Sequence, residues 1–494
     1  MTCCIPQRIV LAIMAFLGFT CEYMMRNLLS LAITQIAKKN VTYYQVIEGD
    51  VCPSDNNTLT DSGSDSVEGT YEWSEEIQGV ILSSFYWGYI VTHIPGGMLV
   101  EKLGGKITLL AGIVATSILT LLTPASIIYG GSTLLIINRV IMGLCQGFLY
   151  SAVFGLLASW IPLRERTTLG VFVLCGIQFG SILATYLSGV LLQKIDGWDW
   201  PFYIYGIVGF IWSLAFAIFC SKDPESNRFI TEDEKNYLRK EIGVLERDTN
   251  LPSTPFKKIL TSVPVWAIII SQTGMDFSFY VMTTDLPKYF ADIMRIDVER
   301  NGLYSSLPQV LNFFSAMAFG LLSDICINKE YLSVKNTRKL FTSTGIIGLA
   351  VCFIMASYSG CDRLQAVLFF SFASGFAGLD NSRINNMDLS PNYAPTIIAL
   401  VNSCGSIMGI LAPIAVGLLT KNSTLLEWRL VFWMVFGILM ATGLFYLIFA
   451  DGKVQSWNDP NRRHNGTIAE NGNGHLKHGD SEEELKDNFI KNRF

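Results

Sequence analysis

The chain has 494 residues, half of them hydrophobic and only 16% charged, and its mean hydropathy is +0.39. Soluble domains carry about 25% charged residues, so this balance indicates a membrane protein. The net charge of -5 excludes a strongly basic nucleic-acid-binding protein, and the eleven cysteines form no CxxC pair or Cys/His cluster of the kind that indicates a metal site.

Twelve apolar runs follow one another along the chain, each near the ~20 residues that a helix needs to cross a bilayer. The sequence therefore predicts an all-α membrane protein with twelve transmembrane helices and both termini on one side. We expect an N-terminal six-helix bundle over 1–220 and a C-terminal six-helix bundle over 262–450. The runs cover 9–37, 76–100, 107–130, 132–161, 168–193, 200–220, 262–284, 302–323, 340–358, 364–387, 395–419 and 428–450.

Two polar segments lie outside these runs. Residues 221–261 join the bundles, and Thr231 followed by Glu234 resembles a capping box, so we interpret this segment as a cytoplasmic linker with a short, solvated helix. Residues 451–494 are rich in Asn, Gly, Asp and Glu, a composition that predicts a disordered cytoplasmic tail.

The distribution of basic residues predicts the orientation. If both termini are cytoplasmic, the inner connections hold 17 Lys and Arg residues and the outer connections hold 9. This positive-inside bias favours cytoplasmic termini. Glycosylation sequons at Asn40, Asn56 and Asn422 then lie on the outer side, where they are predicted sites of modification.

Cys52 and Cys361 also fall in segments that this orientation places outside. The sequence allows one bridge between them, although the scattered cysteines indicate no disulfide framework.

A decapeptide recurs in the two halves. GMLVEKLGGK spans 97–106 and GLLSDICINK spans 320–329, each at the expected cytoplasmic end of the second helix of its half. Two copies at equivalent points imply a duplicated 6+6 transporter, in which the substrate binds near the midplane and the halves rock. The acids Glu101 and Asp324, with Lys106, are predicted gating residues, because a pairing that exists in only one conformation acts as a latch.

These features resemble the major facilitator superfamily. A narrower resemblance covers nearly the whole chain through QGVILSSFYWGYIVTHIPGGMLVEKLGGK, LLTPAS, WIPLRER, LPKYF, YSSLPQ, NNMDLSPNYA, GSIMGILAPIAVGLLT and VQSWN. These motifs are similar to the anion–cation symporter family, solute carrier family 17, which includes vesicular glutamate, sialic acid and sodium-phosphate transporters. The CCIPQR amino terminus is similar to insect members described as inorganic phosphate cotransporters.

Two arginines are the predicted anion-binding residues. Arg139 is the only charge in the apolar run 132–161, and an arginine cannot shed its proton to escape the cost of burial. Arg26 matches a family arginine on the first helix that the resemblance implicates in substrate contact. Glu22 lies four residues before it, so the two can pair on one helix face and Glu22 can take part in coupling. The alternative for each arginine is a permanent structural pairing.

The fourth run departs from the family pattern. Sialic acid and glutamate carriers have glutamate where this chain has Gln146, the sialic acid type has another at Met142, and a family histidine is replaced by Phe154. Arg139 therefore has no acid on its own helix, which weakens proton coupling. The phosphate and urate branch is similar in having Gln at this place, and the sequence favours that branch.

The second half supplies Asp276, which can bind sodium, titrate or balance the arginines, and is a predicted coupling residue. Asp388 is predicted to cap a helix or to gate, and Asp380 can pair with Arg383. Tyr89 and Tyr280 are predicted to line the substrate path, and His93 is a candidate proton relay.

The sequence as a whole predicts a secondary active transporter of organic or inorganic anions that works by alternating access. No Walker-type loop is present, so we expect no enzyme and no cofactor, and sodium, proton or voltage gradients as the energy source. The expected partners are a small anionic substrate and the lipid bilayer, without nucleic acid, and the expected state is a monomer. The predicted topology is compatible with the plasma membrane and with a lysosomal or vesicular membrane. The alternatives are a non-transporting anion sensor or scaffold and a channel-like anion conductance.

Overall fold

The computed structural model describes residues 6–37, 52, 70–195, 197–243, 255–390 and 393–458. These residues form helices, apart from turns and one isolated bridge between Ala37 and Tyr71. The α-helices are α1 Gln7–Ile36, α2 Glu75–Leu103, α3 Gly105–Gln146, α4 Leu149–Trp160, α5 Leu163–Lys194, α6 Trp200–Phe219, α7 Glu232–Gly243, α8 Phe256–Leu260, α9 Val263–Tyr280, α10 Leu286–Asp292, α11 Val298–Asn328, α12 Val334–Ser357, α13 Arg363–Ala377, α14 Ser382–Leu389, α15 Ala394–Leu419 and α16 Leu425–Phe449, with a 3₁₀ turn η1 at Pro224–Ser226 and a π turn η2 at Val281–Asp285.

The helices make twelve passes. Eight helical segments are long and apolar enough to cross a membrane, and one of them, Gly105–Leu157, makes two passes. It turns at Gly131, whose φ of 55° suits glycine, and Asn138 then donates to the Leu119 carbonyl at 3.1 Å from the returning pass. The helix α2 and the pairs α9–α10 and α13–α14 complete the set. The predicted all-α fold with twelve transmembrane helices is therefore confirmed.

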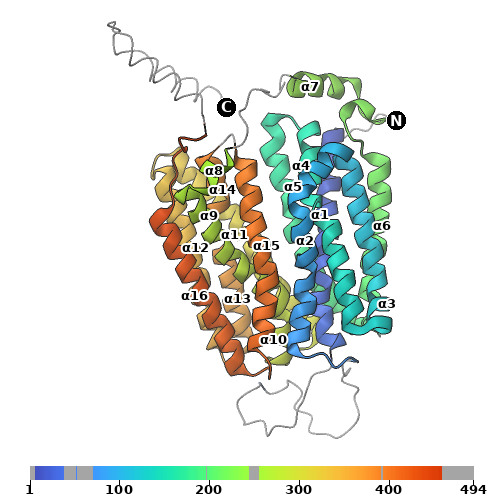
Figure 1. Ribbon diagram of the computed structural model, residues 1–494, viewed down its shortest axis with the longest axis vertical. Coiled ribbons are helices and arrows are strands. Elements are labelled where there is room, and N and C mark those ends of the chain that lie inside the picture. Colours follow the sequence, from blue (N-terminus) through green and yellow to red (C-terminus); the bar gives the residue numbers. More distant parts are fainter. Residues whose placement is uncertain are drawn as a thin grey trace.

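The passes form two bundles that lie side by side, α1 to α6 in one and α9 to α16 in the other (Figure 1). Each bundle packs its own apolar core. A smaller aromatic cluster around Phe85, Tyr86 and Met142 lies between them, because it packs against Tyr280 and Ile410 of the second bundle.

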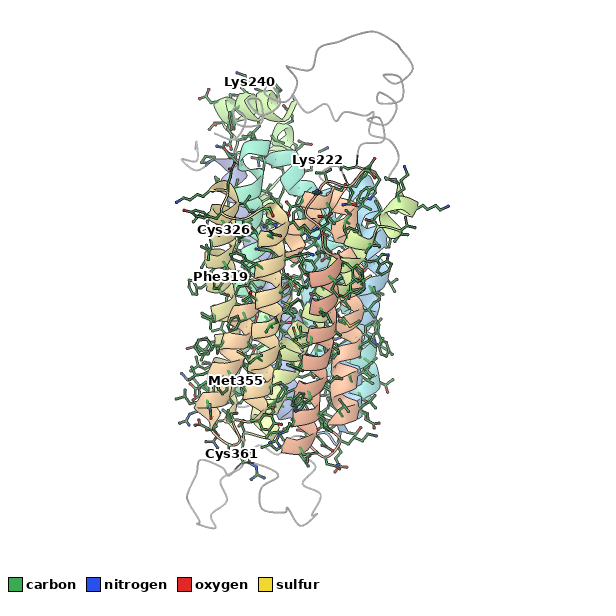
Figure 2. All side chains as sticks on the ribbon, turned by 90° about the vertical axis from the view of Figure 1, so that its left-hand side faces the viewer. Lys222, Lys240, Phe319, Cys326, Met355 and Cys361 are labelled. Atoms are coloured by element: carbon green, nitrogen blue, oxygen red, sulfur yellow. A yellow bond between two sulfur atoms is a disulfide. The ribbon has the colours of Figure 1, made fainter. Side chains whose placement is uncertain are left out.

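The molecule has two ends that we name by the chain. The terminal face is the end at which α1 begins, α16 finishes and α7 lies, and the opposite face is the other end (Figure 1). In Figure 2, Lys222 and Lys240 lie toward the terminal face, Cys361 lies at the opposite face, and Phe319 and Met355 lie on the flank between them. Apolar flanks between polar ends are what a bilayer requires.

Helix α7 lies where the sequence predicts a short linker helix, and it is solvated on one side and docked on the other. Its first turn is capped as expected, since the Glu234 amide donates to Thr231 Oγ1 at 3.3 Å. The Glu234 carboxylate instead accepts from the backbone amides of Gln7 and Arg8 at 2.8 and 3.2 Å, so it caps the N-terminus of α1. Leu238 is buried in the core of the first bundle. The helix docks because a carboxylate and an apolar side chain both find partners there.

The packed part of the chain extends past residue 450. The Gln455 amide donates to the Leu389 carbonyl at 2.9 Å, and Ser390 Oγ donates to Asn458 Oδ1 at 2.8 Å. Trp457 is buried against α14 and α15. The VQSWN segment therefore fastens the end of the second bundle, while the predicted tail from 459 onward lies outside the described residues.

The duplication predicted from the decapeptides is visible in the helices. Both decapeptides lie at the terminal face, at the ends of α2 and α11. The fourth pass of each half is also interrupted, at Gly147–Phe148 between α3 and α4 and at Gly378–Asn381 between α13 and α14. An interrupted helix exposes backbone polar groups at membrane depth, which is tolerated where they line a site or are buried in protein.

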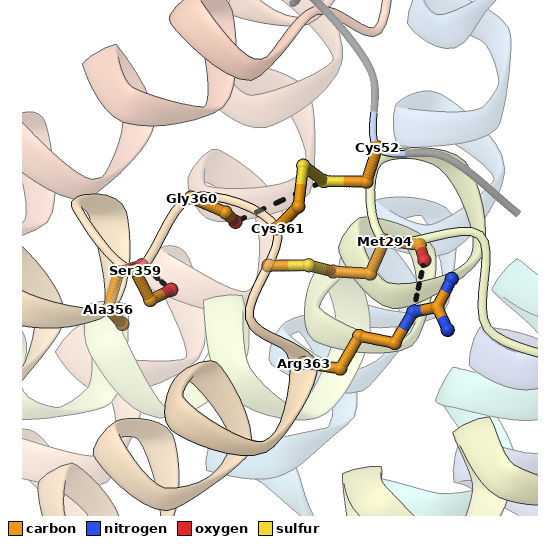
Figure 3. The surroundings of a disulfide bond; sticks show 7 residues. All are labelled: Cys52, Met294, Ala356, Ser359, Gly360, Cys361 and Arg363. Carbon is orange, nitrogen blue, oxygen red and sulfur yellow. Dashed lines mark hydrogen bonds between the residues drawn. A yellow bond between two sulfur atoms is a disulfide. The ribbon is translucent and has the colours of Figure 1, made fainter. Parts of the chain in front are cut away.

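A disulfide joins Cys52 to Cys361 at the opposite face (Figure 3), with the two Cα atoms 5.3 Å apart. Cys52 lies in the connection between α1 and α2, and Cys361 lies between α12 and α13, so the bond ties one bundle to the other. The Cys52 amide also donates to the Ile293 carbonyl at 3.2 Å. The bridge that the sequence only allowed is therefore formed.

We expect this bond to hold the two halves together after the linker is cut. A protease site inserted between residues 244 and 254 should give two fragments that migrate together in denaturing electrophoresis and separate after reduction. Cys361→Ser should separate them without reductant, whereas Cys352→Ser, which replaces a buried free cysteine, should behave like the parent. Separation of the unreduced parent fragments would contradict the pairing.

Candidate functional site

Arg26 of α1 is buried among polar and aromatic partners. Its side chain is 6% exposed, its NH2 group donates to Glu22 Oε1 at 3.0 Å, and its Nε donates to Gln146 Oε1 at 3.0 Å. The i,i+4 pairing predicted from the sequence is therefore present. Three rings also face the guanidinium, with centroids 4.5 Å away for Tyr23, 4.6 Å for Phe85 and 4.8 Å for Tyr89. Arg26 is held firmly in place.

Arg139 of α3 is equally buried, at 5% exposure, but has poorer partners. Its NH2 group donates to the Arg26 carbonyl at 3.3 Å, and its NH1 group lies 3.4 Å from the Met142 sulfur, a weak acceptor. The Phe85 ring lies 5.1 Å from the guanidinium carbon. Among the described residues no carboxylate pairs with Arg139.

Both guanidinium groups contact the ring of Phe85. Close packing of α2 on α3 places the ring there, because a Cβ on Gly143 would collide with the Phe85 carbonyl and one on Gly88 with the Val140 carbonyl. A buried aromatic face attracts a cation by about 2 kcal/mol or more when water is excluded. The glycines therefore let one ring stabilise two positive charges.

Three buried polar atoms around Arg26 lack hydrogen-bond partners in the described part of the chain. They are Glu22 Oε2, Arg139 Nε and Gln146 Nε2. Two of these are N–H donors without an acceptor, and a buried donor left unsatisfied costs about 1–3 kcal/mol. The site therefore has unused capacity for a ligand with acceptor oxygens and negative charge.

The interruption of the fourth pass lies beside this site. Gln146 is the last residue of α3, and His93 Nδ1 lies 3.2 Å from the Gly147 carbonyl, to which it donates. Rings continue from the site toward His93, with Phe85 and Tyr89 centroids 5.8 Å apart and Tyr89 and His93 centroids 5.3 Å apart. The proton-relay role of His93 stays a prediction.

The second bundle places a polar group at the matching position. Asp276 of α9 accepts from Gln272 Nε2 at 3.2 Å, and Gln272 Oε1 accepts from Ser382 at 2.9 Å, just after the interruption between α13 and α14. Asp276 is 8% exposed and its Oδ2 abuts Gly405 of α15. In both halves, a side chain of the first helix thus bonds to the interrupted fourth pass.

Tyr280 and Tyr89 occupy the boundary between the bundles. The Tyr280 ring packs edge-on against Tyr86 at 4.8 Å, which joins α9 to α2, and both Tyr280 and Tyr89 remain partly exposed. Their place fits the predicted substrate path. Trp87, from the same SSFYWGY run, is 38% exposed and sits on the outer side of α2.

The predicted gating residues lie at the terminal face, and two of them are only partly described. The side chains of Glu101 and Asp324 lie outside the described residues. Lys106 donates to the Ala217 carbonyl near the end of α6 at 3.2 Å, which suits a cation at a helix C-terminus. Asp388 accepts from Arg338 Nε at 2.8 Å, and Arg338 also donates to Ser323 of the second decapeptide at 3.1 Å. Gating by these residues stays a prediction.

The structure describes only some of the residues in the predicted Asp380–Arg383 pair and in the three predicted glycosylation sites. Asp380 Oδ1 accepts from the Ser382 amide at 2.9 Å, and the Arg383 side chain lies outside the described residues. Asn40 and Asn56 also lie outside them. Asn422 is exposed at the opposite face, where its Nδ2 donates to Glu427 Oε1 at 2.9 Å. Glycosylation at these positions stays a prediction.

The sequence analysis assigned no individual role to Tyr23, Phe85, Tyr86 or Gln272. It interpreted Gln146 as a departure from the family glutamate that favours the phosphate and urate branch, and not as a hydrogen-bond partner of Arg26. The signal for Phe85 was its spacing from Gly88, because a glycine three residues away marks the helix face that packs closely. Tyr23 also carried a signal, because it lies three residues before Arg26 on α1, a spacing that places both side chains on one helix face.

Comparisons with known proteins agree with this architecture. The family described as Major Facilitator Superfamily matches residues 15–413. A Drosophila melanogaster protein named "Putative inorganic phosphate cotransporter" is 35% identical over 92% of this chain and 87% of its own length, and human Sialin is 33% identical over 92% and 91%. The crystal structure of a D-xylose-proton symporter, 14% identical, superposes with a TM-score of 0.67 over 90% of this chain and 98% of its own, which shows a shared fold. The chain belongs to the major facilitator superfamily and, within it, to the anion–cation symporter family, solute carrier family 17.

Proposed function

We propose that this transporter carries a small anion with a phosphate or carboxylate group, by alternating access, and that Arg26 and Arg139 hold the anion. The observation that carries the proposal is the charge balance of the site. Two buried guanidinium groups contact one Phe85 ring, and Glu22 is the only carboxylate that pairs with them among the described residues.

A buried charge without a counter-ion is costly, so Arg139 favours the arrival of an anion. Breaking a buried pair costs about 3–5 kcal/mol, because it leaves one charge uncompensated. The free donors at Arg139 Nε and Gln146 Nε2 would bond the oxygens of the substrate. Arginine suits this task because its planar fork matches phosphate and carboxylate geometry.

The related Drosophila protein is named as an inorganic phosphate cotransporter, which supports the phosphate class. Gln146 supports the same class, since the resemblance associates Gln at this place with the phosphate and urate branch. A tetrahedral anion presents acceptors in several directions, and the unused donors of the site belong to two different residues of α3.

We infer that an ion gradient or membrane voltage drives uptake rather than nucleotide hydrolysis. Glu22 Oε2 has no hydrogen-bond partner among the described residues, so this carboxylate could take a proton when an anion draws Arg26 away. Asp276 offers the corresponding carboxylate in the second bundle for sodium or a proton. The carrier would work as a monomer, because each chain contains both halves.

We also propose that the terminal face is cytoplasmic. Disulfides persist in oxidising compartments, so the Cys52–Cys361 bond supports an opposite face that meets the outside or an organelle lumen. Asn422 lies on that same face. The plasma membrane and a lysosomal or vesicular membrane both satisfy this orientation.

Uptake into proteoliposomes tests the function directly. Radiolabelled phosphate, urate, sialic acid and glutamate should be compared while sodium, pH and voltage are varied separately. We expect saturable uptake of at least one of these anions that responds to one gradient. Binding without counterflow would identify a sensor, and currents far above carrier turnover would identify a channel.

Replacing Arg139 with Gln should abolish uptake without unfolding the protein. We expect uptake to fall about 100-fold or more, because the anion would lose the guanidinium group that offsets its negative charge. The thermal unfolding midpoint should not fall, since the substitution removes a buried cation that has no carboxylate partner among the described residues. Arg139→Lys should keep part of the activity. Uptake by Arg139→Gln within twofold of the parent would rule out the binding role.

Replacing Gln146 with Glu should make uptake more dependent on pH. The new carboxyl would lie 3.0 Å from Arg26 Nε, in the place of the amide oxygen. When protonated it resembles glutamine, and when ionised it competes with the anion for Arg26, so uptake should fall as pH rises, relative to the parent. Phe154→His, a second family position on that pass, provides a comparison. An unchanged pH profile would show that position 146 does not set coupling.

A further inference from the structure

The two bundles meet in a seam at the opposite face. Glycines allow the helices to approach closely there, because any larger side chain would collide with the opposite backbone. A Cβ on Gly79 of α2 would collide with the Pro413 carbonyl of α15, and a Cβ on Gly189 of α5 would collide with Gly302 of α11. In Figure 1 the bundles come together toward this face and diverge toward the terminal face. Whatever opens the opposite face must separate this seam.

Two ion pairs cross the seam from neighbouring residues of α2. Glu76 pairs with Lys421 at 2.5 Å, and these side chains are 48% and 58% exposed. Glu75 pairs with Lys288 of α10, and these side chains are only 17% and 5% exposed. An exposed pair contributes little, whereas a buried ammonium group cannot lose its partner without a large cost. The Lys288 pair is therefore the one that resists opening.

Lys288 has a second carboxylate in its own bundle. Asp285 lies three residues earlier, at the end of the π turn η2, so the two side chains share a helix face. Asp285 is 2% exposed, and its Oδ2 has no hydrogen-bond partner among the described residues. The closed seam thus leaves a buried carboxylate oxygen next to the lysine unused.

Glu75 and Lys288 respond differently to separation. Glu75 is the first residue of α2, where the helix N-terminus favours negative charge, and Gln78 donates to it at 3.4 Å. No helix end supports Lys288, because α9, η2 and α10 form one continuous helical stretch. Lys288 therefore needs a carboxylate of its own bundle when the seam opens. Asp292, four residues later on α10, already has an interaction partner, whereas Asp285 has the unused Oδ2.

We propose that Lys288 is a switching cation of the transport cycle. It pairs with Glu75 across the seam when the opposite face is closed, and with Asp285 of its own bundle when that face is open. The π turn and Pro287 interrupt the backbone hydrogen bonding at this point, so the helix can adjust there. This inference rests on the alternating access proposed above.

Opposite effects of two carboxamide substitutions test the switch. Glu75→Gln weakens only the closed pair, so opening of the seam should increase about tenfold. Asp285→Asn removes the carboxylate proposed to hold Lys288 in the open state and relieves an unsatisfied carboxylate oxygen in the closed state, so opening should decrease. Opening is measured as amide hydrogen exchange of the purified full-length protein, in peptides that cover 75–82 of α2 and 413–419 of α15.

Two further variants serve as controls. Lys288→Met should increase exchange as Glu75→Gln does. Lys421→Met, which removes the exposed pair from the same seam, should change exchange by less than about twofold. If Asp285→Asn does not yield a monodisperse protein, Asp285→Ser replaces it, and exchange should again decrease.

The outcomes separate a switch from a static support. If Asp285 only stabilises the fold, its substitution will increase exchange, as Glu75→Gln does, and that result overturns the proposal, as does an absence of change. The exchange measurement requires no transport. A protein that transports no anion yet shows the opposite shifts would refute the proposed function alone, and active uptake without these shifts would refute the switch alone.

Discussion

Two positive charges share one buried aromatic ring, and the rest of the site depends on that arrangement. The guanidinium carbons of Arg26 and Arg139 lie 4.6 and 5.1 Å from the centre of the Phe85 ring, in a place where water cannot solvate them fully. Glu22 offsets one charge and leaves the other in excess. A site with this balance would discriminate by charge first, because neutral or cationic solutes could not offset the remaining guanidinium.

The two bundles use related positions for different chemistry. In the first, Arg26 reaches Gln146 at the interruption of the fourth pass, and in the second, Gln272 reaches Ser382 at the equivalent interruption. The first half therefore carries the cations and the second half carries Asp276 with neutral amides. Such a division lets one half bind the anion while the other supplies a coupling carboxylate, and the aromatic contact between Tyr86 and Tyr280 joins them.

The opposite face combines a covalent tie with a breakable one. The Cys52–Cys361 bond does not break when helices move, so it can keep the two bundles together through the cycle. The Lys288–Glu75 pair determines how readily the seam opens.

Much of this organisation followed from the sequence, because the bilayer imposes a strict rule. A helix that crosses it needs about 20 apolar residues, so the run lengths predicted twelve passes and the decapeptides predicted their duplication. The same rule made Arg26 and Arg139 conspicuous, since charges are rare in such runs. Partners distant in sequence were decided only by tertiary packing. Four such contacts join residues of different helices that lie 54 to 227 positions apart: Gln146 with Arg26, Phe85 with both arginines, Glu234 with the start of α1, and Lys288 with Glu75. Helical periodicity carries no information across such distances.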